Sequence, residues 1–164
     1  MSKTIPAKRM QLSEIASKQY AAVLRLSSSV DLDAELRELV DVRVSQINGC
    51  AFCLDMHWKD ARDLGETEER LYMLGAWRES ELYSARERAA LELSEAITLI
   101  GEGHVPDEVW ERARAEFDEY ELGQLVFAIA TINTWNRILI AARVEPGHYQ
   151  PGRFRAAADT KSRR

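Results

Sequence analysis

Apolar residues recur at spacings of three and four along almost the whole chain, and no segment shows a sustained alternation of apolar and polar residues. The first pattern places apolar side chains on one face of an α-helix, whereas alternation is the pattern of a half-buried strand. The sequence therefore predicts an all-α fold. Its 164 residues, 46% of them hydrophobic, are enough for one buried core, and since no linker divides the chain, we expect a single domain.

Helix ends can be placed from local signals. Asp33 suits a helix N-terminus, Asn48-Gly49 suits a left-handed cap, and Ser84 with Glu87 matches a capping box. We expect helices over about residues 13–26, 33–47, 50–64, 66–77, 84–100 and 121–142, with another short helix beginning near Pro106.

Three of these helices carry more specific expectations. The serine cluster at 27–29 is expected to end the first helix, whose apolar face would include Ile15 and Leu26. Trp110 and Phe117 are expected to anchor the short helix that begins near Pro106. The last helix has no charged residue between Leu122 and Asn136 and is expected to be central and buried on several sides.

Charge and hydropathy exclude several classes of partner. A net charge of -5 and a pI near 5.3 disfavour nucleic-acid binding. No run of twenty apolar residues predicts a membrane span, and the N-terminal segment lacks the apolar stretch of a secretory signal, so we expect a cytoplasmic protein. Residues 1–149 would form the helical domain, and residues 150–164, which are locally basic, a flexible tail.

The chain has two cysteines, Cys50 and Cys53, and His57 follows one helical turn later. On a helix this Cys-x-x-Cys-x-x-x-His spacing puts all three side chains on one face, with the two sulfurs close enough to form a disulfide. Structural disulfides are rare in a reducing cytosol, so the pair is interpreted as redox-active or metal-binding.

The reactive form of a cysteine is the thiolate, which the site must stabilise. The helix N-terminus favours Cys50 as the thiolate, whereas proximity to His57 favours Cys53, and the residues alone leave both assignments open. A carboxylate that orients His57 could come from the preceding helix, where Glu38 would lie opposite His57 after an antiparallel return; Glu35 and Asp41 are the other candidates.

The constellation of Glu38, eleven intervening residues, Cys50, Cys53 and His57 resembles the signature of the AhpD-like alkylhydroperoxidase and carboxymuconolactone decarboxylase superfamily. The resemblance extends from about Met10 to Tyr149 and includes Leu-Gly-Ala-Trp-Arg at 74–78 and Thr-Ile-Asn-Thr-Trp-Asn-Arg at 131–137.

This resemblance implies an all-helical protein that assembles into trimers or hexamers and reduces hydroperoxides without haem, flavin or metal. It further implies that Cys53 attacks the peroxide, that Cys50 resolves the sulfenic acid to a disulfide, and that Glu38 and His57 relay protons. The implied reductant is a dithiol, such as a lipoylated protein. One departure is Phe52, which stands where peroxidases of this family can carry a second histidine.

Two other functions fit the same residues. A non-enzymatic redox sensor or stress-response module would use the Cys50–Cys53 disulfide as a switch. A zinc site would use Cys50, Cys53 and His57, but a closed site needs a fourth ligand, which His104 or His148 could supply only by an unexpected approach; both are expected to be exposed loop residues.

Overall fold

The computed structural model describes residues 7–153, and every regular element among them is a helix, which confirms the all-α prediction. The helices are α1 (Leu12–Ile15), α2 (Ser17–Ser29), α3 (Ala34–Asn48), α4 (Ala51–Asp63), α5 (Glu68–Met73), the 3-10 helix η1 (Leu74–Glu79), α6 (Ala85–Thr98), α7 (Asp107–Glu116) and α8 (Glu119–Ala142).

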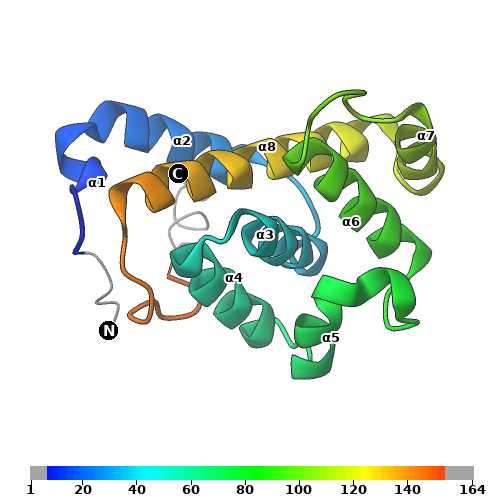
Figure 1. Cartoon of the computed structure of the whole chain (residues 1–164), viewed down its shortest axis with the longest axis horizontal. Coiled ribbons are helices and arrows are strands. Elements are labelled where there is room, and N and C mark those ends of the chain that lie inside the picture. The colour runs from blue at the N-terminus through cyan, green and yellow to red at the C-terminus, as the bar shows by residue number, and fades with distance from the viewer. Residues whose placement is uncertain (1–6, 154–164) are drawn as a thin grey trace, which may run out of the picture.

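Helix α3 occupies the centre of the molecule, with α4, α6 and α8 packed around it (Figure 1). Asp33 caps its N-terminus by accepting a hydrogen bond from the backbone N–H of Leu36. Val40, Val42 and Val44 have no exposed surface, so side chains on several sides of the helix are buried. Polar residues on α3 are therefore held in fixed surroundings.

Helix α8 is the longest element, at 24 residues, and begins with a capping box formed by Asp118 and Glu121. By length and composition it could cross a membrane, but a core helix of a soluble protein passes the same test, and 44% of its most apolar stretch is buried inside the molecule. It runs along one side of the fold, against α2 and α3 (Figure 1). Helix α8 thus forms one wall of the core.

The N-terminal helices differ from the sequence prediction. Instead of one helix over residues 13–26, a break at Ala16 separates α1 from α2, and α2 continues through Ser29. The serines do not end the helix because the hydroxyls of Ser28 and Ser29 donate to the carbonyls of Leu24 and Leu26. No residue of α2 is fully buried.

Three further expectations were wrong. The helix expected over 66–77 divides into α5 and η1, with a non-helical backbone at Ala76. Trp110 is 37% exposed and does not anchor α7, whereas Phe117 is buried as expected. Ile15 and Leu26 are 68% and 41% exposed, so neither lies in the core.

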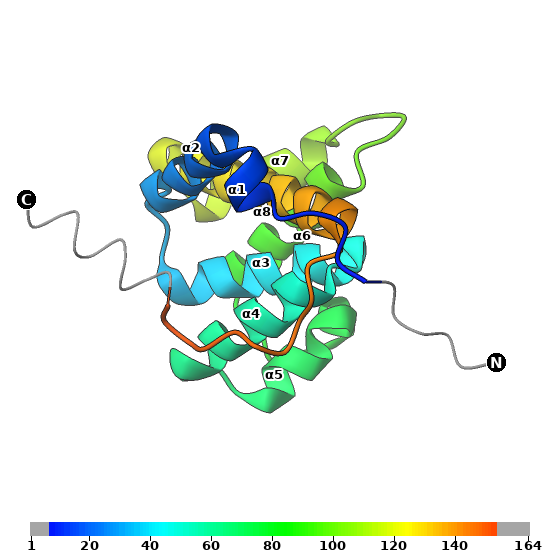
Figure 2. The same cartoon turned by 90° about the vertical axis from the view of Figure 1, so that its left-hand side faces the viewer.

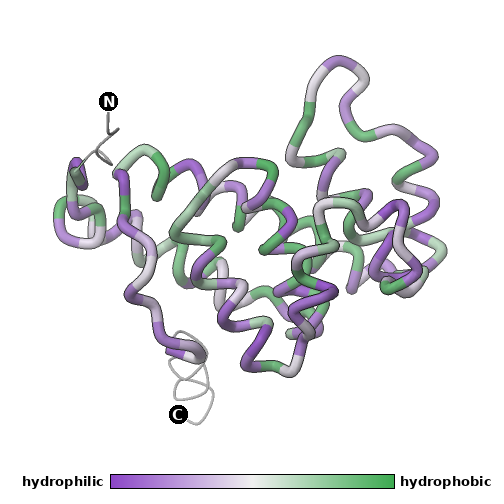
Figure 3. Tube along the Cα trace, turned by 60° about the horizontal axis from the view of Figure 1, so that its bottom comes forward, coloured by the Kyte–Doolittle hydropathy of each residue, from purple (hydrophilic) through white to green (hydrophobic). Residues whose placement is uncertain are grey.

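The chain after α8 runs back across the molecule and lies beside α4 (Figures 1 and 2). Polar and apolar residues are interspersed along the helices rather than gathered in separate segments (Figure 3), as expected for amphipathic helices around one core. Residues 154–164, most of the expected basic tail, lie outside the described residues.

Candidate active site

The turn between α3 and α4 sets the position of the two cysteines. Gly49 adopts a left-handed conformation, with φ of 70°, which glycine reaches without steric cost. The N–H of Cys50 donates to the carbonyl of Ser45 at 3.1 Å and so closes the end of α3. Cys50 becomes the N-cap residue of α4, and Cys53 lies in the first turn, as the sequence predicts.

The sulfurs of Cys50 and Cys53 lie 2.9 Å apart, and both cysteines are free thiols. A disulfide bond is about 2.05 Å long, so its formation needs only a small approach of the two side chains. The exposed fraction is 1% for Cys50 and zero for Cys53. The pair is therefore a preformed dithiol shielded from solvent.

The surroundings favour Cys50 as the thiolate. A hydrogen bond from the Cys53 thiol, assisted by backbone N–H groups of Cys53 and Phe52 and by the charge of His57, outweighs burial and lowers the pKa of Cys50 to about 7. The same contact with Cys50, together with burial, raises the pKa of Cys53, and the side-chain amide of Asn136 only partly opposes this. Of the two thiols, Cys50 is therefore the one that loses its proton first.

His57 faces two carboxylates from successive turns of α3. Its Nδ1 lies 2.8 Å from Oε2 of Glu38 and 3.6 Å from Oδ2 of Asp41. Burial alone would lower the pKa of His57, but the charges of Asp41 and Glu38 and the hydrogen bond to Glu38 raise it to about 9. Near neutral pH His57 is therefore an imidazolium whose Nδ1–H donates to Glu38. The expected approach of Glu38 to His57 is present.

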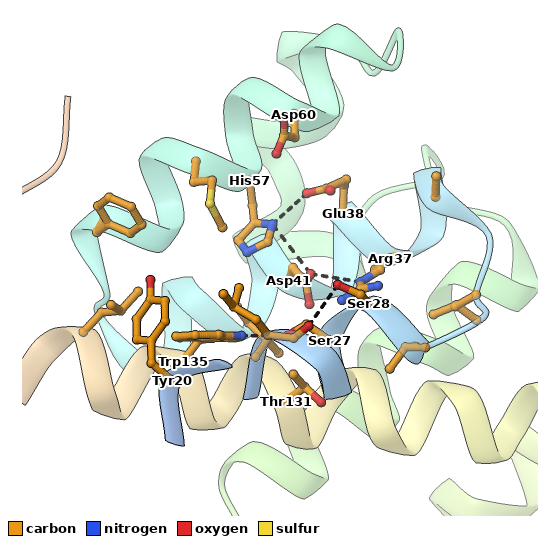
Figure 4. A pocket seen from close by; sticks show the side chains of 18 residues that line it. Tyr20, Ser27, Ser28, Arg37, Glu38, Asp41, His57, Asp60, Thr131 and Trp135 are labelled. Atoms are coloured by element: carbon orange, nitrogen blue, oxygen red, sulfur yellow. Dashed lines mark hydrogen bonds and ion pairs between the residues drawn. The ribbon is translucent and has the colours of Figure 1, made fainter. Parts of the chain in front are cut away.

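A cavity of about 500 Å³ opens beside His57, between α2, α3, α4 and α8 (Figure 4). Its apolar wall includes Tyr20 and Trp135, whose rings meet edge to face with centroids 5.0 Å apart. Phe52 and Met56 line it from α4, whereas Cys50 and Cys53 are not among its lining residues. This volume and largely apolar lining suit a small organic molecule.

Side-chain amides from α8 hold the turn that precedes the cysteines. Asn48 donates to the side-chain oxygens of Asn133 (3.0 Å) and Asn136 (2.9 Å), and Asn136 donates to the hydroxyl of Ser45. The sequence analysis gave these two asparagines no role at the site. The signal was two asparagines three residues apart on an otherwise apolar helix, one of which, Asn136, has no exposed surface.

The segment after α8 is attached to α4 by several hydrogen bonds. The N–H of Gly147 donates to Asp55, Lys59 donates to the carbonyl of Tyr149, and the hydroxyl of Tyr149 donates to Asp60 at 2.8 Å. Asp60 also accepts from the N–H of Gly152. We call residues 144–153 the C-terminal strap.

The remaining candidates do not join the site. His104 and His148 are exposed, as expected. Glu38, Asp41 and His57 are the group of potential metal ligands found among the described residues, with polar atoms within 4.8 Å of one another. The set expected for zinc was instead Cys50, Cys53 and His57.

Comparisons with known proteins identify the family and the fold. The carboxymuconolactone decarboxylase family profile matches residues 18–96. Uncharacterized protein YdfG of Bacillus subtilis (strain 168) is 48% identical over 138 residues, which are 82% of this chain and 94% of that protein. A similar crystal structure is that of a protein of unknown function from Agrobacterium tumefaciens, provisionally assigned as an antioxidant defence protein, AhpD. It superposes with a TM-score of 0.83 at 36% identity, and the match covers 87% of this chain and 100% of that one.

The fold also occurs in a protein with a different named activity. The debrominase Bmp8 superposes with a TM-score of 0.69 at 18% identity, over 87% of this chain and 75% of that one. At this identity the similarity concerns the fold alone. The helical architecture and the relatives together define the class, and the chain belongs to the AhpD-like, carboxymuconolactone decarboxylase superfamily.

Proposed function

We propose that the protein is a thiol-dependent hydroperoxide reductase in which Cys53 attacks the peroxide and Cys50 resolves the product to a disulfide. The observation that carries this proposal is the 2.9 Å contact between two buried free thiols at the start of α4. Membership of the AhpD-like superfamily supports a peroxidase-related activity. The order of the two cysteines rests on the family resemblance.

The first chemical step requires the Cys53 thiolate. Because Cys50 is the thiol that loses its proton first, the Cys53 proton passes to Cys50 along their hydrogen bond. The Cys53 sulfur then bonds to the terminal peroxide oxygen, the O–O bond breaks, and the departing alkoxide takes a proton from the His57 imidazolium. The products are a Cys53 sulfenic acid and an alcohol.

Resolution uses the neighbouring thiol. The Cys50 sulfur bonds to the Cys53 sulfur, the S–O bond breaks, and the hydroxyl group leaves as water with the Cys50 proton. A dithiol, such as a lipoylated protein, returns the disulfide to two thiols and is itself oxidised to a disulfide. Since neither sulfur is exposed to solvent, peroxide and reductant reach them only through local opening of the surrounding side chains.

The decisive test is steady-state peroxide reduction with dihydrolipoamide, comparing wild type with Cys53→Ser and Cys50→Ser. Both variants should lose turnover, while His104→Gln, a change at an exposed histidine, should retain it. Stoichiometric thiol oxidation by peroxide without turnover would instead support the redox sensor.

Trapping with dimedone determines the order of the two cysteines. In Cys50→Ser we expect the adduct on Cys53, because the sulfenic acid there cannot be resolved. An adduct on Cys50 in the Cys53→Ser variant, with none on Cys53 in Cys50→Ser, would reverse the assignment. That outcome would agree with the lower pKa of Cys50.

We further propose that the protein is cytoplasmic and assembles into a trimer or hexamer. This assembly is the one that the family resemblance implies. Light scattering coupled to size-exclusion chromatography measures the assembly. A monomer at micromolar concentration would contradict it.

A further inference from the structure

We propose that Asp41 is a positioning residue that acts through His57, keeping its imidazole charged while Glu38 fixes the orientation of the ring. The family resemblance singles out Glu38 and His57 but not Asp41. The inference concerns the source of the charge on His57, and only its kinetic consequence rests on the function proposed above.

The two carboxylates have different geometries toward the same ring atom. Glu38 and Asp41 are three residues apart on α3 and both face His57 (Figure 4). Glu38 lies at hydrogen-bond distance from Nδ1, 2.8 Å, whereas Asp41 lies at 3.6 Å, which is too long for a hydrogen bond. The ring donates one Nδ1 proton, which Glu38 accepts, so Asp41 acts through its charge.

The hydrogen bonds of Asp41 do not explain why this carboxylate is buried. The residue is 3% exposed, and its Oδ1 is a buried side-chain oxygen without a hydrogen-bond partner among the described residues. Burying a carboxylate oxygen unpaired disfavours folding, so an unsatisfied group of this kind requires an explanation. Charge stabilisation at His57 supplies one, because a Coulomb interaction in a buried site needs no hydrogen bond.

The other charged and titratable groups around His57 do not replace Asp41. On α3, Arg37 lies 3.6 Å from Asp41 and opposes a positive charge on the ring. On α4, the Cys50 thiolate, Cys53 and Asp60 share the helix with His57, and α2 contributes the phenol of Tyr20 to the cavity. The residues that α8 contributes to the cavity, Thr131, Ile132, Trp135 and Leu139, carry no charge.

The electrostatics agree with this geometry. Burial would lower the pKa of His57, and the largest opposing influence is the charge of Asp41, followed by that of Glu38. The longer distance of Asp41 is therefore offset by its complete burial, which reduces screening by water. This arrangement has a signal in the sequence. A Glu-x-x-Asp pair, one turn apart, lies on the helix that precedes Cys-x-x-Cys-x-x-x-His.

The test is an NMR titration of the histidine side chains in the reduced protein. Asp41→Asn should lower the titration midpoint of His57 by about one pH unit or more, whereas Glu35→Gln, which removes an exposed charge from the same helix, should leave it unchanged within about 0.2 unit. Asp41→Glu, which retains the charge, should restore most of the shift. A midpoint in Asp41→Asn that matches wild type would overturn the proposal.

The unaltered protein provides a second measurement if Asp41→Asn does not fold. The side-chain carbon of Asp41 and the ring of His57 should respond together as Asp41 titrates, since each charge is felt by the other. Titration of Asp41 without any response at His57 would refute the coupling. In the kinetic arm, Asp41→Asn should move the alkaline limb of the peroxidase pH profile to lower pH. Absence of turnover in wild type would sink the proposed function but leave the NMR result intact.

Discussion

Two carboxylates in this fold, the half-buried Glu95 and the buried Asp41, have opposite hydrogen-bonding surroundings. Glu95 on α6 accepts hydrogen bonds from Arg43 and Trp77, each at 2.8 Å, and from Arg78. Burial would raise the pKa of Glu95, but these donors lower it. Asp41 has an unpaired oxygen, and burial raises its pKa to about 6 despite nearby positive charges.

This difference separates a structural carboxylate from a functional one. Glu95 joins α3, η1 and α6, and every donor around it is a link between elements. Asp41 links no elements by hydrogen bonds of its own and instead faces His57 beside the cavity. Unsatisfied buried polar groups in native proteins often mark such sites, where function is maintained at a cost in stability.

The largest effect should come from a matched pair of charge-removing variants. Glu95→Gln should lower the free energy of unfolding by about 3 kcal/mol, because it leaves two arginines and an indole N–H without their shared acceptor charge. Asp41→Asn should change it by less than about 1.5 kcal/mol, because the charge interaction lost at His57 is offset by relief from burying an unpaired carboxylate oxygen. Urea unfolding at pH 7 under reducing conditions measures both. Equal losses would remove the distinction between the two sites.

The pH dependence of stability tests the charge on His57. Its pKa is raised from 6.5 to about 9, so its contribution is fully present below pH 6.5 and is lost as the pH rises to about 9. The Cys50 pKa is lowered from 9 to about 7, so its contribution is present above pH 9 and is lost as the pH falls to about 7. The two oppose each other between about pH 7 and 9.

Removing the Cys50 thiol should therefore make the contribution of His57 to the pH dependence of stability measurable. In reduced Cys50→Ser, the free energy of unfolding should fall by about 1 to 3 kcal/mol between pH 6.5 and 9, a larger fall than in wild type. Adding His57→Gln should abolish this fall. A flat profile in Cys50→Ser would mean that His57 is not charged in the folded protein near neutral pH.

A smaller loss of stability is expected when the hydrogen bonds among Asn48, Asn136 and Ser45 are removed. Asn136→Ala leaves the amide of Asn48 and the hydroxyl of Ser45 each without one partner, which should cost about 1 to 3 kcal/mol. It should also slow disulfide formation between Cys50 and Cys53, because the turn before them is less fixed. Thr134→Ala, a polar deletion at a half-buried position of the same helix that bonds only within the helix, is the control. Unchanged oxidation kinetics would limit Asn136 to a packing role.

The smallest change in stability is expected for an exposed ion pair, which serves as the reference for the others. Arg114 pairs with Glu111 on the surface of α7 at 3.2 Å, and both side chains are about 60% exposed. Arg114→Ala should change the free energy of unfolding by less than about 0.5 kcal/mol, since solvent screens exposed pairs. A loss comparable to that of Glu95→Gln would show that burial does not govern the cost of losing a carboxylate partner here.

Much of the site could be predicted because its signals are local in sequence. Asn48-Gly49 fixes the reversal, the Cys-x-x-Cys-x-x-x-His spacing fixes one helix face, and the antiparallel return brings Glu38 to His57. Each of these depends on helix periodicity and on a residue with a strong backbone preference. The assignment of attack to Cys53 stays a prediction.

The features that sequence reasoning missed depend on contacts between distant segments. The unpaired state of Asp41 results from what packs over it, and the role of Asn136 results from α8 lying against the α3–α4 turn. Trp110 has the size and apolar surface of an anchoring residue, but its side chain on α7 is exposed. Helical periodicity identifies apolar faces, but it does not say which neighbour, if any, covers each one.

The C-terminal strap gives the end of the chain a mechanical connection to the redox helix. Gly147, Tyr149 and Gly152 all bond to residues of α4, whose first turn carries both sulfurs. Force applied to the strap, by a fused domain or by attachment to a solid support, would therefore act on α4 through these hydrogen bonds. Immobilised or C-terminally fused forms of this protein should be made with a long, slack spacer, and an N-terminal attachment is the safer choice for a redox electrode.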